Sequence, residues 1–556
     1  MSDTICLVAS GDSRLSANRV CWPAQAALEA AVVKVFARLG RTVVRGHGTD
    51  PVKGHGFLDC QIAGIEAFRH IDLLAPLVVV EAVWQYTSHV LPGLTKHRGP
   101  ILTLANWSGQ WPGLVGMLNL NGSLTKAGIP YSTWWSEDFE DELTRRKLAQ
   151  WLSDGRIDHD ATHVRPFDAA GLPADLQQAA ADGATLGAAL SADQAVMGVF
   201  DEGCMGMYNA IIPDHLLHDM GVFKERLSQS ALHAAMRQVS DASARAHLDW
   251  LLARGMTFDL GTDPASDLTE AQVLEGLKMY DAAVRMASEF GCAVIGIQYQ
   301  QGLKDTCVAS DLTEGLLNTP DRPPVVGHDG RVLFDRLPVP HFNEVDECAG
   351  LDALLTNRVW TDAGVDPSTT LHDVRWGAPF RGEGVDEFVW VFEISGAVPP
   401  SHLVNGYAGA RGERQPPMYF PRGGATIKGV SRPGEIVWSR IFVEGTGRGA
   451  SGRERLCMDI GRGGVLTLPK EETEQRWRAT TPQWPIMHAV LYGISRDQFM
   501  GRHKANHIQV AYAPDAAAAR RLLAAKAGMA RHLSIDVSVC GDIEDCVGRH
   551  QAPRMT

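Results

Sequence analysis

The side chains in this sequence that could carry chemistry are four carboxylates and two histidines from three separate segments. The segments read PHFNEVDECAGLDALL at 340–355, TTLHDVRW at 369–376 and GRHKANHIQV at 501–510. They contribute Glu344, Asp346, Glu347, Asp373, His503 and His507. Carboxylates from separate segments can bind a hard divalent cation or work as a general acid and base. A metal site also needs a further ligand, and a histidine from the third segment could supply it.

For each of these residues taken alone, an ordinary structural role competes with the chemical one. An isolated acid is most often a solvated surface residue or a helix N-cap. His503 and His507 are spaced for one face of a helix, but IQVAYA directly after His507 favours a loop that enters a strand. The pair also lacks the inner glutamate of an H-E-x-x-H motif. Spacing therefore leaves open which acids and which histidine act.

The composition is typical of a globular protein with several domains. The chain has 556 residues, 45% of them hydrophobic and 21% charged, and at about 100–200 residues per domain it predicts about three domains. The net charge of −13 argues against a nucleic-acid partner, because phosphate binding needs clustered positive charge. No stretch approaches the roughly 18 uninterrupted apolar residues of a membrane span, so we expect no membrane partner.

The N-terminus and the cysteines favour a cytoplasmic protein. MSDTICLVAS lacks the basic and then apolar regions of a signal peptide. The ten cysteines include no C-x-x-C pair, and Cys540 and Cys546 lack zinc-finger spacing. We therefore expect mostly buried, free thiols in a reducing compartment.

The order of strand-like and helix-like segments predicts an α/β fold, with two doubly wound parallel-sheet domains followed by a β-rich C-terminal domain. In 1–190, apolar runs such as LLAPLVVVEAVW and PILTLAN alternate with helical stretches, as in a parallel sheet covered on both faces. The alternation returns in 191–357, from AVMGVF to CAVIGIQYQ. In 358–556, shorter runs such as EFVWVFEIS and GEIVWSRIFVEG indicate the β-rich domain.

Amide and aromatic residues at the expected strand ends suit a polyhydroxylated ligand. ANWSGQWPG follows one predicted strand and carries Asn106, and GIQYQQG ends another with Gln298 and Gln300. Open parallel sheets bind ligands at the carboxyl ends of their strands, where rings contact C–H groups and amides bind hydroxyls. The sequence has no G-x-G-x-x-G between a strand and a helix and no G-x-x-x-x-G-K-[ST], so we expect no nucleotide cofactor.

Several segments, in order along the chain, resemble the L-fucose isomerase family. GVFDEGCMGMYNAIIPDHLLHDMGVFKERLSQSAL is similar to the start of that family's second domain, and GIQYQQG followed by DLTEGLLN is similar to its glutamine strand. FNEVDECAGLDALL and LHDVRW are similar to the segments that supply its metal-binding Glu and Asp, and KANHI to its Asn-His pair. RGGATIKGV, TLPKEE and PQWPIM resemble its C-terminal pattern. The similarity covers nearly the whole chain.

The resemblance implies an aldose–ketose isomerase for a pentose or 6-deoxyhexose such as D-arabinose or L-fucose. It implies Mn²⁺ bound by Glu344, Asp373 and His507, ligands that would also accept Mg²⁺ or Co²⁺. Glu344 and Asp373 would move the proton between C2 and C1 of the open-chain sugar through a cis-enediol. The resemblance does not decide which of the two carboxylates is the base that removes the proton. Asp346 and Glu347 are left with supporting or surface roles.

The resemblance also implies a hexamer of two stacked trimers, in which the N-terminal domain of one subunit completes the site of a neighbour. Arg14 and Trp84 would reach across that boundary. Asn106 and Gln298 or Gln300 would contact the sugar hydroxyls. The domain at 191–357 would carry part of the site, and the domain at 358–556 its metal-binding Asp and His.

Departures from the family pattern concern the sugar-facing half of the site. The family has a tyrosine after its glycine cluster, in an RGGGY-type string, where this chain reads RGGAT at 422–426. Ile508 stands where glycine is usual, and His503 replaces an aromatic residue. Two alternatives therefore stay open. One is an epimerase, lyase or isomerase that uses the same fold and metal on a modified or acidic sugar, and the other is a non-catalytic sugar-binding relative.

Overall fold

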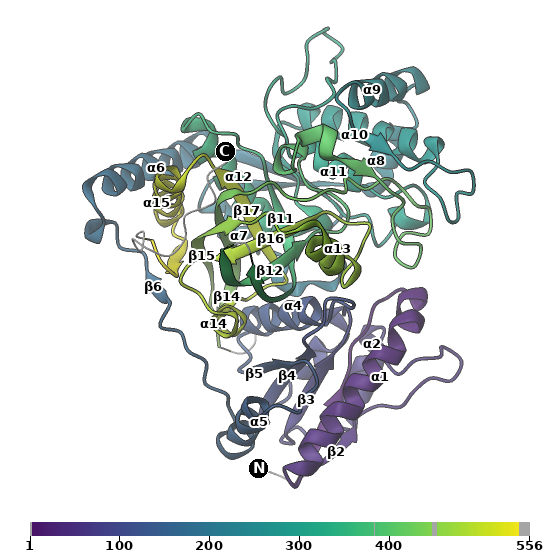
Figure 1. Ribbon diagram of the computed structural model, residues 1–556, viewed down its shortest axis with the longest axis vertical. Coiled ribbons are helices and arrows are strands. Elements are labelled where there is room, and N and C mark those ends of the chain that lie inside the picture. Colours follow the sequence, from purple (N-terminus) through teal and green to yellow (C-terminus); the bar gives the residue numbers. More distant parts are fainter. Residues whose placement is uncertain (1–2, 383, 448–452, 544–556) are drawn as a thin grey trace.

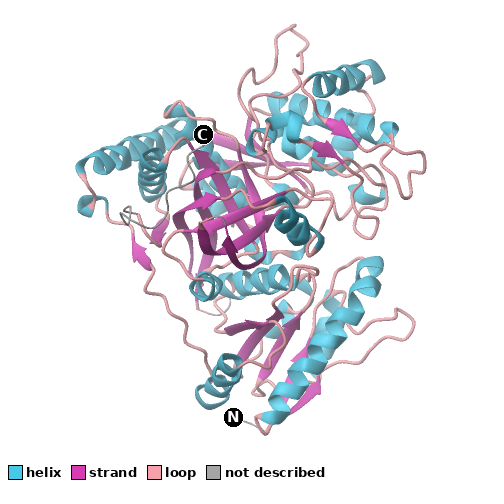
Figure 2. Cartoon of the chain, viewed as in Figure 1, coloured by secondary structure: helices cyan, strands magenta, loops and turns pink. Residues whose placement is uncertain are grey.

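The computed structural model describes residues 3–382, 384–447 and 453–543, and it confirms the predicted α/β fold (Figure 1). Two parallel sheets and one mixed, strand-rich sheet organise the chain, and a short two-stranded sheet joins β9 (Thr257–Phe258) to β13 (Arg411–Gly412). The mixed sheet lies at the centre with helices around it, between the first sheet and the helices of the second (Figure 2).

The first sheet has five parallel strands in the order β2-β1-β3-β4-β5. These strands are β1 (Thr4–Val8), β2 (Thr42–Arg45), β3 (Leu77–Glu81), β4 (Ile101–Asn106) and β5 (Ser132–Ser136). The helices of this region are α1 (Leu15–Arg38), α2 (Gln61–Arg69), α3 (Leu91–Leu94), α4 (Gly113–Lys126) and α5 (Glu142–Asp154). β3 is buried at every position, which explains its unbroken apolar sequence. The strand order reverses between β1 and β3, the point at which open sheets bind ligands.

Helix α1 is the one helix in the described part of the chain that is long and apolar enough to cross a membrane. Its most apolar window is 39% buried inside the protein, and Arg19, Glu29 and Lys34 interrupt its apolar run. Length and composition alone are weak evidence, because a core helix of a globular protein meets the same criterion. The absence of a membrane partner stays a prediction.

The second sheet has three parallel strands in the order β10-β7-β8. They are β7 (Ala195–Phe200), β8 (Val222–Leu227) and β10 (Cys292–Ile297). Its helices are α7 (Asp214–His218), α8 (Gln229–Met236), α9 (Asp241–Ala253), α10 (Glu270–Glu289) and α11 (Asp311–Leu317). The longest, α10, starts at a capping box in which Thr269 and Gln272 satisfy each other's backbone N–H groups.

In the mixed sheet, six strands close into a ring, because β14 pairs with both β17 and β15. The ring consists of β14 (Gly434–Thr446), β17 (His507–Ala513), β11 (Thr369–Gly382), β12 (Val385–Glu393), β16 (Ile486–Leu491) and β15 (Arg453–Val465). β18 (Asp536–Cys540) extends the sheet from β15. The helices of this region are α12 (Glu347–Asp362), α13 (Lys470–Arg478), α14 (Arg496–Arg502) and α15 (Ala516–His532).

One segment that precedes the second sheet in sequence lies with the mixed sheet in space. β6 (Val164–Pro166) pairs with β18, and α6 (Ala174–Asp193) runs beside α15 (Figure 1). The two helix backbones approach closely at Gly183, where a Cβ would lie 1.8 Å from the Ala525 carbonyl oxygen. The predicted first domain, 1–190, therefore spans both the first sheet and a part of the chain that packs on the C-terminal region.

The cysteines whose side chains are described agree with the expectation of free thiols. Eight are free, six of these are buried, and Cys6 and Cys60 are half-buried. Cys546 lies outside the described residues.

Candidate functional site

A cavity lies where the carboxyl ends of both parallel sheets meet the mixed sheet. The loops after β1 and β3 flank the point where the strand order of the first sheet reverses, and both reach the cavity. The loops after β7 and β10 of the second sheet also reach the cavity, and so does β11 of the mixed sheet. The first sheet contributes Arg14 and Trp84 to the cavity, the second sheet contributes Met205 and Gln300, and β11 contributes Asp373 and Arg375.

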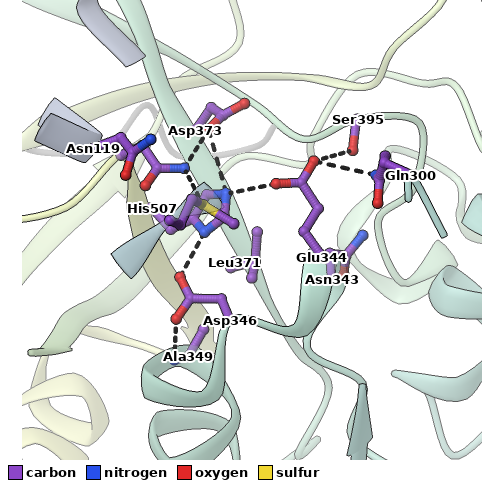
Figure 3. Close-up of polar contacts among 12 residues, drawn as sticks. Asn119, Gln300, Asn343, Glu344, Asp346, Ala349, Leu371, Asp373, Ser395 and His507 are labelled. Carbon is purple, nitrogen blue, oxygen red and sulfur yellow. Dashed lines mark hydrogen bonds and ion pairs between the residues drawn. The ribbon is translucent and has the colours of Figure 1, made fainter. Parts of the chain in front are cut away.

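Glu344 reaches the cavity from a strained turn before α12. Its φ is 59°, and that of Val345 is 55°, which is the left-handed region that non-glycine residues rarely adopt. Asp346 follows as the N-cap of α12, and its carboxylate accepts a hydrogen bond from the backbone N–H of Ala349. The turn directs the Glu344 side chain away from α12 and toward His507 (Figure 3).

Asp373 and His507 come together because their strands pair. β11 and β17 are antiparallel, and Asp373 stands directly opposite His507 in the register. Asp373 Oδ1 lies 3.4 Å from His507 Nε2, and Glu344 Oε2 lies 3.7 Å from the same nitrogen (Figure 3). The three side chains predicted to bind a metal therefore converge on one point.

Asp346 fixes the orientation of the His507 ring. Asp346 Oδ2 lies 2.7 Å from His507 Nδ1 (Figure 3), and Arg440 donates to both Asp346 oxygens, at 2.6 and 3.1 Å. Burial alone would raise the pKa of Asp346, but Arg440 and His507 outweigh it and hold this pKa well below its usual range. The Asp346 carboxylate occupies Nδ1 and leaves Nε2 facing Glu344 and Asp373, as around metal-binding histidines. Asp346 thus has a buried supporting role.

The other two residues singled out near the site are structural. His503 Nε2 lies 3.0 Å from the backbone oxygen of His507, and its ring stacks on Phe499. Glu347 is buried, with an oxygen 2.7 Å from Lys224 Nζ. Neither His503 nor Glu347 lines the cavity.

Burial and mutual repulsion make the cavity carboxylates weak acids. Burial raises the pKa of Glu344 to about 7, with His507 opposing the rise and Asp373 adding to it. Burial also raises the pKa of Asp373, against the opposing effects of His507 and Arg375. Two buried carboxylates beside one imidazole leave the place where Glu344, Asp373 and His507 meet with more negative than positive charge.

The chemistry of the donors fits a divalent cation, although the side chains stand slightly too far apart to hold one as they are. Among the described residues, no group of three or more His, Cys, Asp and Glu side chains is arranged to hold a metal ion. Two ligands about 2.1 Å from one ion, at right angles, lie about 3.0 Å apart, whereas the distances from His507 Nε2 are 3.4 and 3.7 Å. Asp373 would have to move about 0.4 Å closer to His507 Nε2 and Glu344 about 0.7 Å closer. Two carboxylates and one imidazole suit Mn²⁺, Mg²⁺ or Co²⁺.

Three of the five residues predicted to face a sugar line the cavity. These are Arg14, Trp84 and Gln300. Asn106 ends β4 with its Oδ1 turned toward the start of α4, and Gln298 is fully buried, with its Oε1 accepting the Gln300 backbone N–H at 3.0 Å. Asn106 and Gln298 are therefore not among the residues that line this cavity.

Arg14 lines the cavity of its own chain. Its Nε and Nη2 donate to Asp12 at 2.9 and 2.6 Å, and its Nη1 donates to the Tyr419 carbonyl at 3.3 Å. The guanidinium carbon lies 4.8 Å from the centre of the Tyr419 ring. Trp84 reaches the same cavity. Within one chain, then, the N-terminal domain completes the cavity that the resemblance assigns to a neighbouring subunit, and the hexamer stays a prediction.

The cavity residues that sequence reasoning did not assign to the site include Arg375, Ser395, Tyr419 and Trp484. Ser395 Oγ and Gln300 Nε2 each lie 3.4 Å from Glu344 Oε1. Arg375 had a usable signal, because it lies two residues after Asp373 in a strand and the period of two places alternate residues on one face. The other three lie in loops whose course no local pattern predicts.

The first sheet is tied to the strand that carries Asp373. Trp107, just after β4, donates its indole N–H to the Gly377 carbonyl at 2.9 Å. In return, Arg375 Nε donates to the Gly109 carbonyl at 3.0 Å. The cavity wall and β11 thus share hydrogen bonds in both directions.

Neither a search of protein-family models nor a search of curated proteins finds a match to this chain. The family resemblance therefore stands on the segments named above.

Proposed function

We propose that this chain is a divalent-metal-dependent aldose–ketose isomerase that acts on an open-chain pentose or 6-deoxyhexose. The observation that carries the proposal is the convergence of Glu344 and Asp373 on His507 Nε2. Both carboxylates line a cavity that polar and aromatic side chains also line. The resemblance to the L-fucose isomerase family supports the same activity, the same three ligands and a cytoplasmic homohexamer.

Glu344, Asp373 and His507 would hold the ion, with Mn²⁺ as the first candidate and Mg²⁺ or Co²⁺ as alternatives. When bound, the ion would polarise the sugar carbonyl and acidify the adjacent C–H group. Asp346 contributes indirectly, because it holds His507 with Nε2 toward the two carboxylates.

The protein's own groups would carry the proton transfers. One carboxylate of the Glu344–Asp373 pair removes the C2 proton of an aldose, the resulting cis-enediol takes the proton back at C1, and the hydroxyl proton moves from O2 to O1. The pKa of Glu344 is about 7 in the metal-free protein, and a bound cation would lower it, so this carboxylate would be ionised and able to accept the proton near neutral pH. Gln300 and Ser395, each 3.4 Å from Glu344 Oε1, would orient that carboxylate.

Sugar conversion by purified protein tests this function. Wild-type protein supplied with Mn²⁺ is expected to interconvert an aldose of the L-fucose or D-arabinose type with its ketose, and Glu344→Gln is expected to abolish the reaction without changing the oligomer. Glu347→Gln is the matched control, since it removes a buried carboxylate three positions away that does not line the cavity. Full activity of Glu344→Gln would refute the site assignment.

A different reaction on a related sugar is the second candidate. The RGGAT segment does not supply a tyrosine to the cavity, and the tyrosine that is present, Tyr419, comes from the preceding loop. Exchange of the C2 proton with deuterated solvent, without ketose formation, would favour an epimerase or a lyase on a modified or acidic sugar. Absence of any divalent-ion binding would favour a non-catalytic sugar-binding protein.

A further inference from the structure

The turn that carries Glu344 has a conformation that its residues disfavour. Glu344 has φ 59° and ψ 16°, and Val345 has φ 55°. Left-handed backbone is rare for non-glycine residues and least favourable for a β-branched one such as Val345. Such a conformation persists only where the surrounding structure over-determines it. The groups that hold this turn therefore decide where the Glu344 carboxylate points.

A buried carboxylate outside the cavity, that of Glu314, contacts this turn. Glu314 lies on α11 and is 3% exposed. One of its oxygens accepts a hydrogen bond from Nδ2 of Asn343, the residue directly before Glu344. The other accepts from Ser310 Oγ, at the start of the same helix. Glu314 thus connects α11 directly to the strained turn.

His341 presents a further N–H group to the same carboxylate. Its Nδ1 lies 3.9 Å from Glu314 Oε2 and has no hydrogen-bond partner. Its Nε2 accepts the Ile297 backbone N–H at 3.1 Å, and burial lowers the pKa of His341 to about 3. The neutral ring therefore carries its proton on Nδ1. His341 therefore places an N–H group near the Glu314 carboxylate without a hydrogen bond to it, and Ser310 and Asn343 are the donors that bind its two oxygens.

We propose that Glu314 is a positioning residue that, through Asn343, keeps the turn left-handed and aims Glu344 at His507 Nε2. This inference rests on the metal-binding role proposed for Glu344. An ordinary structural role competes with it, because a buried carboxylate can simply tie α11 to the core. The contact with Asn343 favours positioning, since it fixes the residue adjacent to Glu344.

The test compares two variants of neighbouring buried residues on α11. Glu314→Gln removes one of the two acceptor oxygens. Thr313→Val removes a hydrogen bond of the same helix that runs elsewhere, from Thr313 Oγ1 to the Gly276 carbonyl at 3.0 Å. Titration calorimetry with Mn²⁺ is expected to give a Kd about 10- to 100-fold weaker for Glu314→Gln and an unchanged Kd for Thr313→Val. Both variants are expected to lower the melting temperature.

A double variant separates positioning from general loosening of the core. Combining Glu314→Gln with Asn343→Asp exchanges donor and acceptor between the two positions and restores the hydrogen bond. We expect the double variant to recover most of the Mn²⁺ affinity. Failure of this rescue, or equal loss of affinity in Thr313→Val and Glu314→Gln, would overturn the positioning role.

Crystallography of Glu314→Gln gives an answer that does not depend on metal binding. The Glu344 φ angle is expected to leave the region near 59° and the carboxylate to turn away from His507. An unchanged turn overturns the inference. If the wild type binds no Mn²⁺, the proposed function fails, and the structure of the variant alone then decides whether Glu314 holds the turn.

Discussion

Replacing Glu344 by glutamine is expected to make the metal-free protein more stable at neutral pH. The pKa of Glu344 is raised from 4.5 to about 7 in the folded chain, and each pKa unit corresponds to about 1.4 kcal/mol. The folded state therefore holds this proton more tightly than the unfolded state. The contribution of Glu344 to the free energy of unfolding is therefore greatest below about pH 4.5, falls as the pH rises toward 7, and is constant above it.

At pH 8 the ionised Glu344 carboxylate costs the folded state up to about 3 kcal/mol. This figure is an upper limit, because 12% of the side chain is exposed. Glutamine has nearly the same shape and no charge, so Glu344→Gln is expected to recover this free energy. The gain shrinks to about 1 kcal/mol at pH 5, where the wild-type residue is already mostly protonated.

Urea unfolding of EDTA-treated proteins at pH 8 and pH 5, followed by tryptophan fluorescence, measures the difference. Added Mn²⁺ is expected to stabilise the wild type and not the variant, since the ion binds only the folded site. Glu347→Gln serves as the control for Mn²⁺ binding, because it removes a buried carboxylate that pairs with Lys224 at 2.7 Å and does not line the cavity. A Glu344→Gln protein less stable than the wild type at pH 8 would refute the electrostatic reasoning.

Three further outcomes are expected. Asp346→Asn leaves the buried Arg440 uncompensated, so urea unfolding is expected to show a loss of about 3–5 kcal/mol of stability. Calorimetry is expected to show Mn²⁺ binding about 10- to 100-fold weaker, and a folded variant with wild-type affinity would contradict the role of Asp346. The Mn²⁺ affinity of the wild type is expected to fall by up to tenfold per pH unit below about pH 7, because the ion must displace the Glu344 proton. An affinity that is constant between pH 5 and pH 7 would contradict competition between the ion and the proton at this carboxylate. Lys526→Met removes the cation that pairs with the buried Asp352, and it is expected to destabilise the chain by about 3–5 kcal/mol with no change in Mn²⁺ affinity. A parallel loss of binding would show that this ion pair, which does not line the cavity, also supports the site.

Sequence reasoning was sufficient for the fold because the parallel sheets repeat a simple pattern. Fully buried strands such as β3 appear as unbroken apolar runs, and amphipathic helices separate them. The position of β6 and α6 was not predictable, since a polar, proline-containing stretch does not reveal which distant sheet edge it joins. Closure of the ring is likewise a long-range choice, because it needs β17 to pair with both β14 and β11.

The candidate site was reachable only in part. Single acids in a sequence look alike, and the family resemblance was needed to select Glu344 and Asp373 from their neighbours. Their meeting with His507 depends on the register of β11 and β17, which no spacing along the chain records. The contact between Arg14 and Tyr419 spans 405 positions. For the same reason, the aromatic side of the cavity could not be foreseen.

The reciprocal hydrogen bonds between the loop after β4 and strand β11 make assembly of the chain and assembly of the site a single event. Trp107 reaches Gly377 and Arg375 reaches Gly109, so the loop after β4 stands against β11 as one wall of the cavity that Glu344 also lines. Burial is the main cause of the raised pKa of Glu344. The acidity of this carboxylate is therefore a property of the packed segments around it, and not of the residue alone.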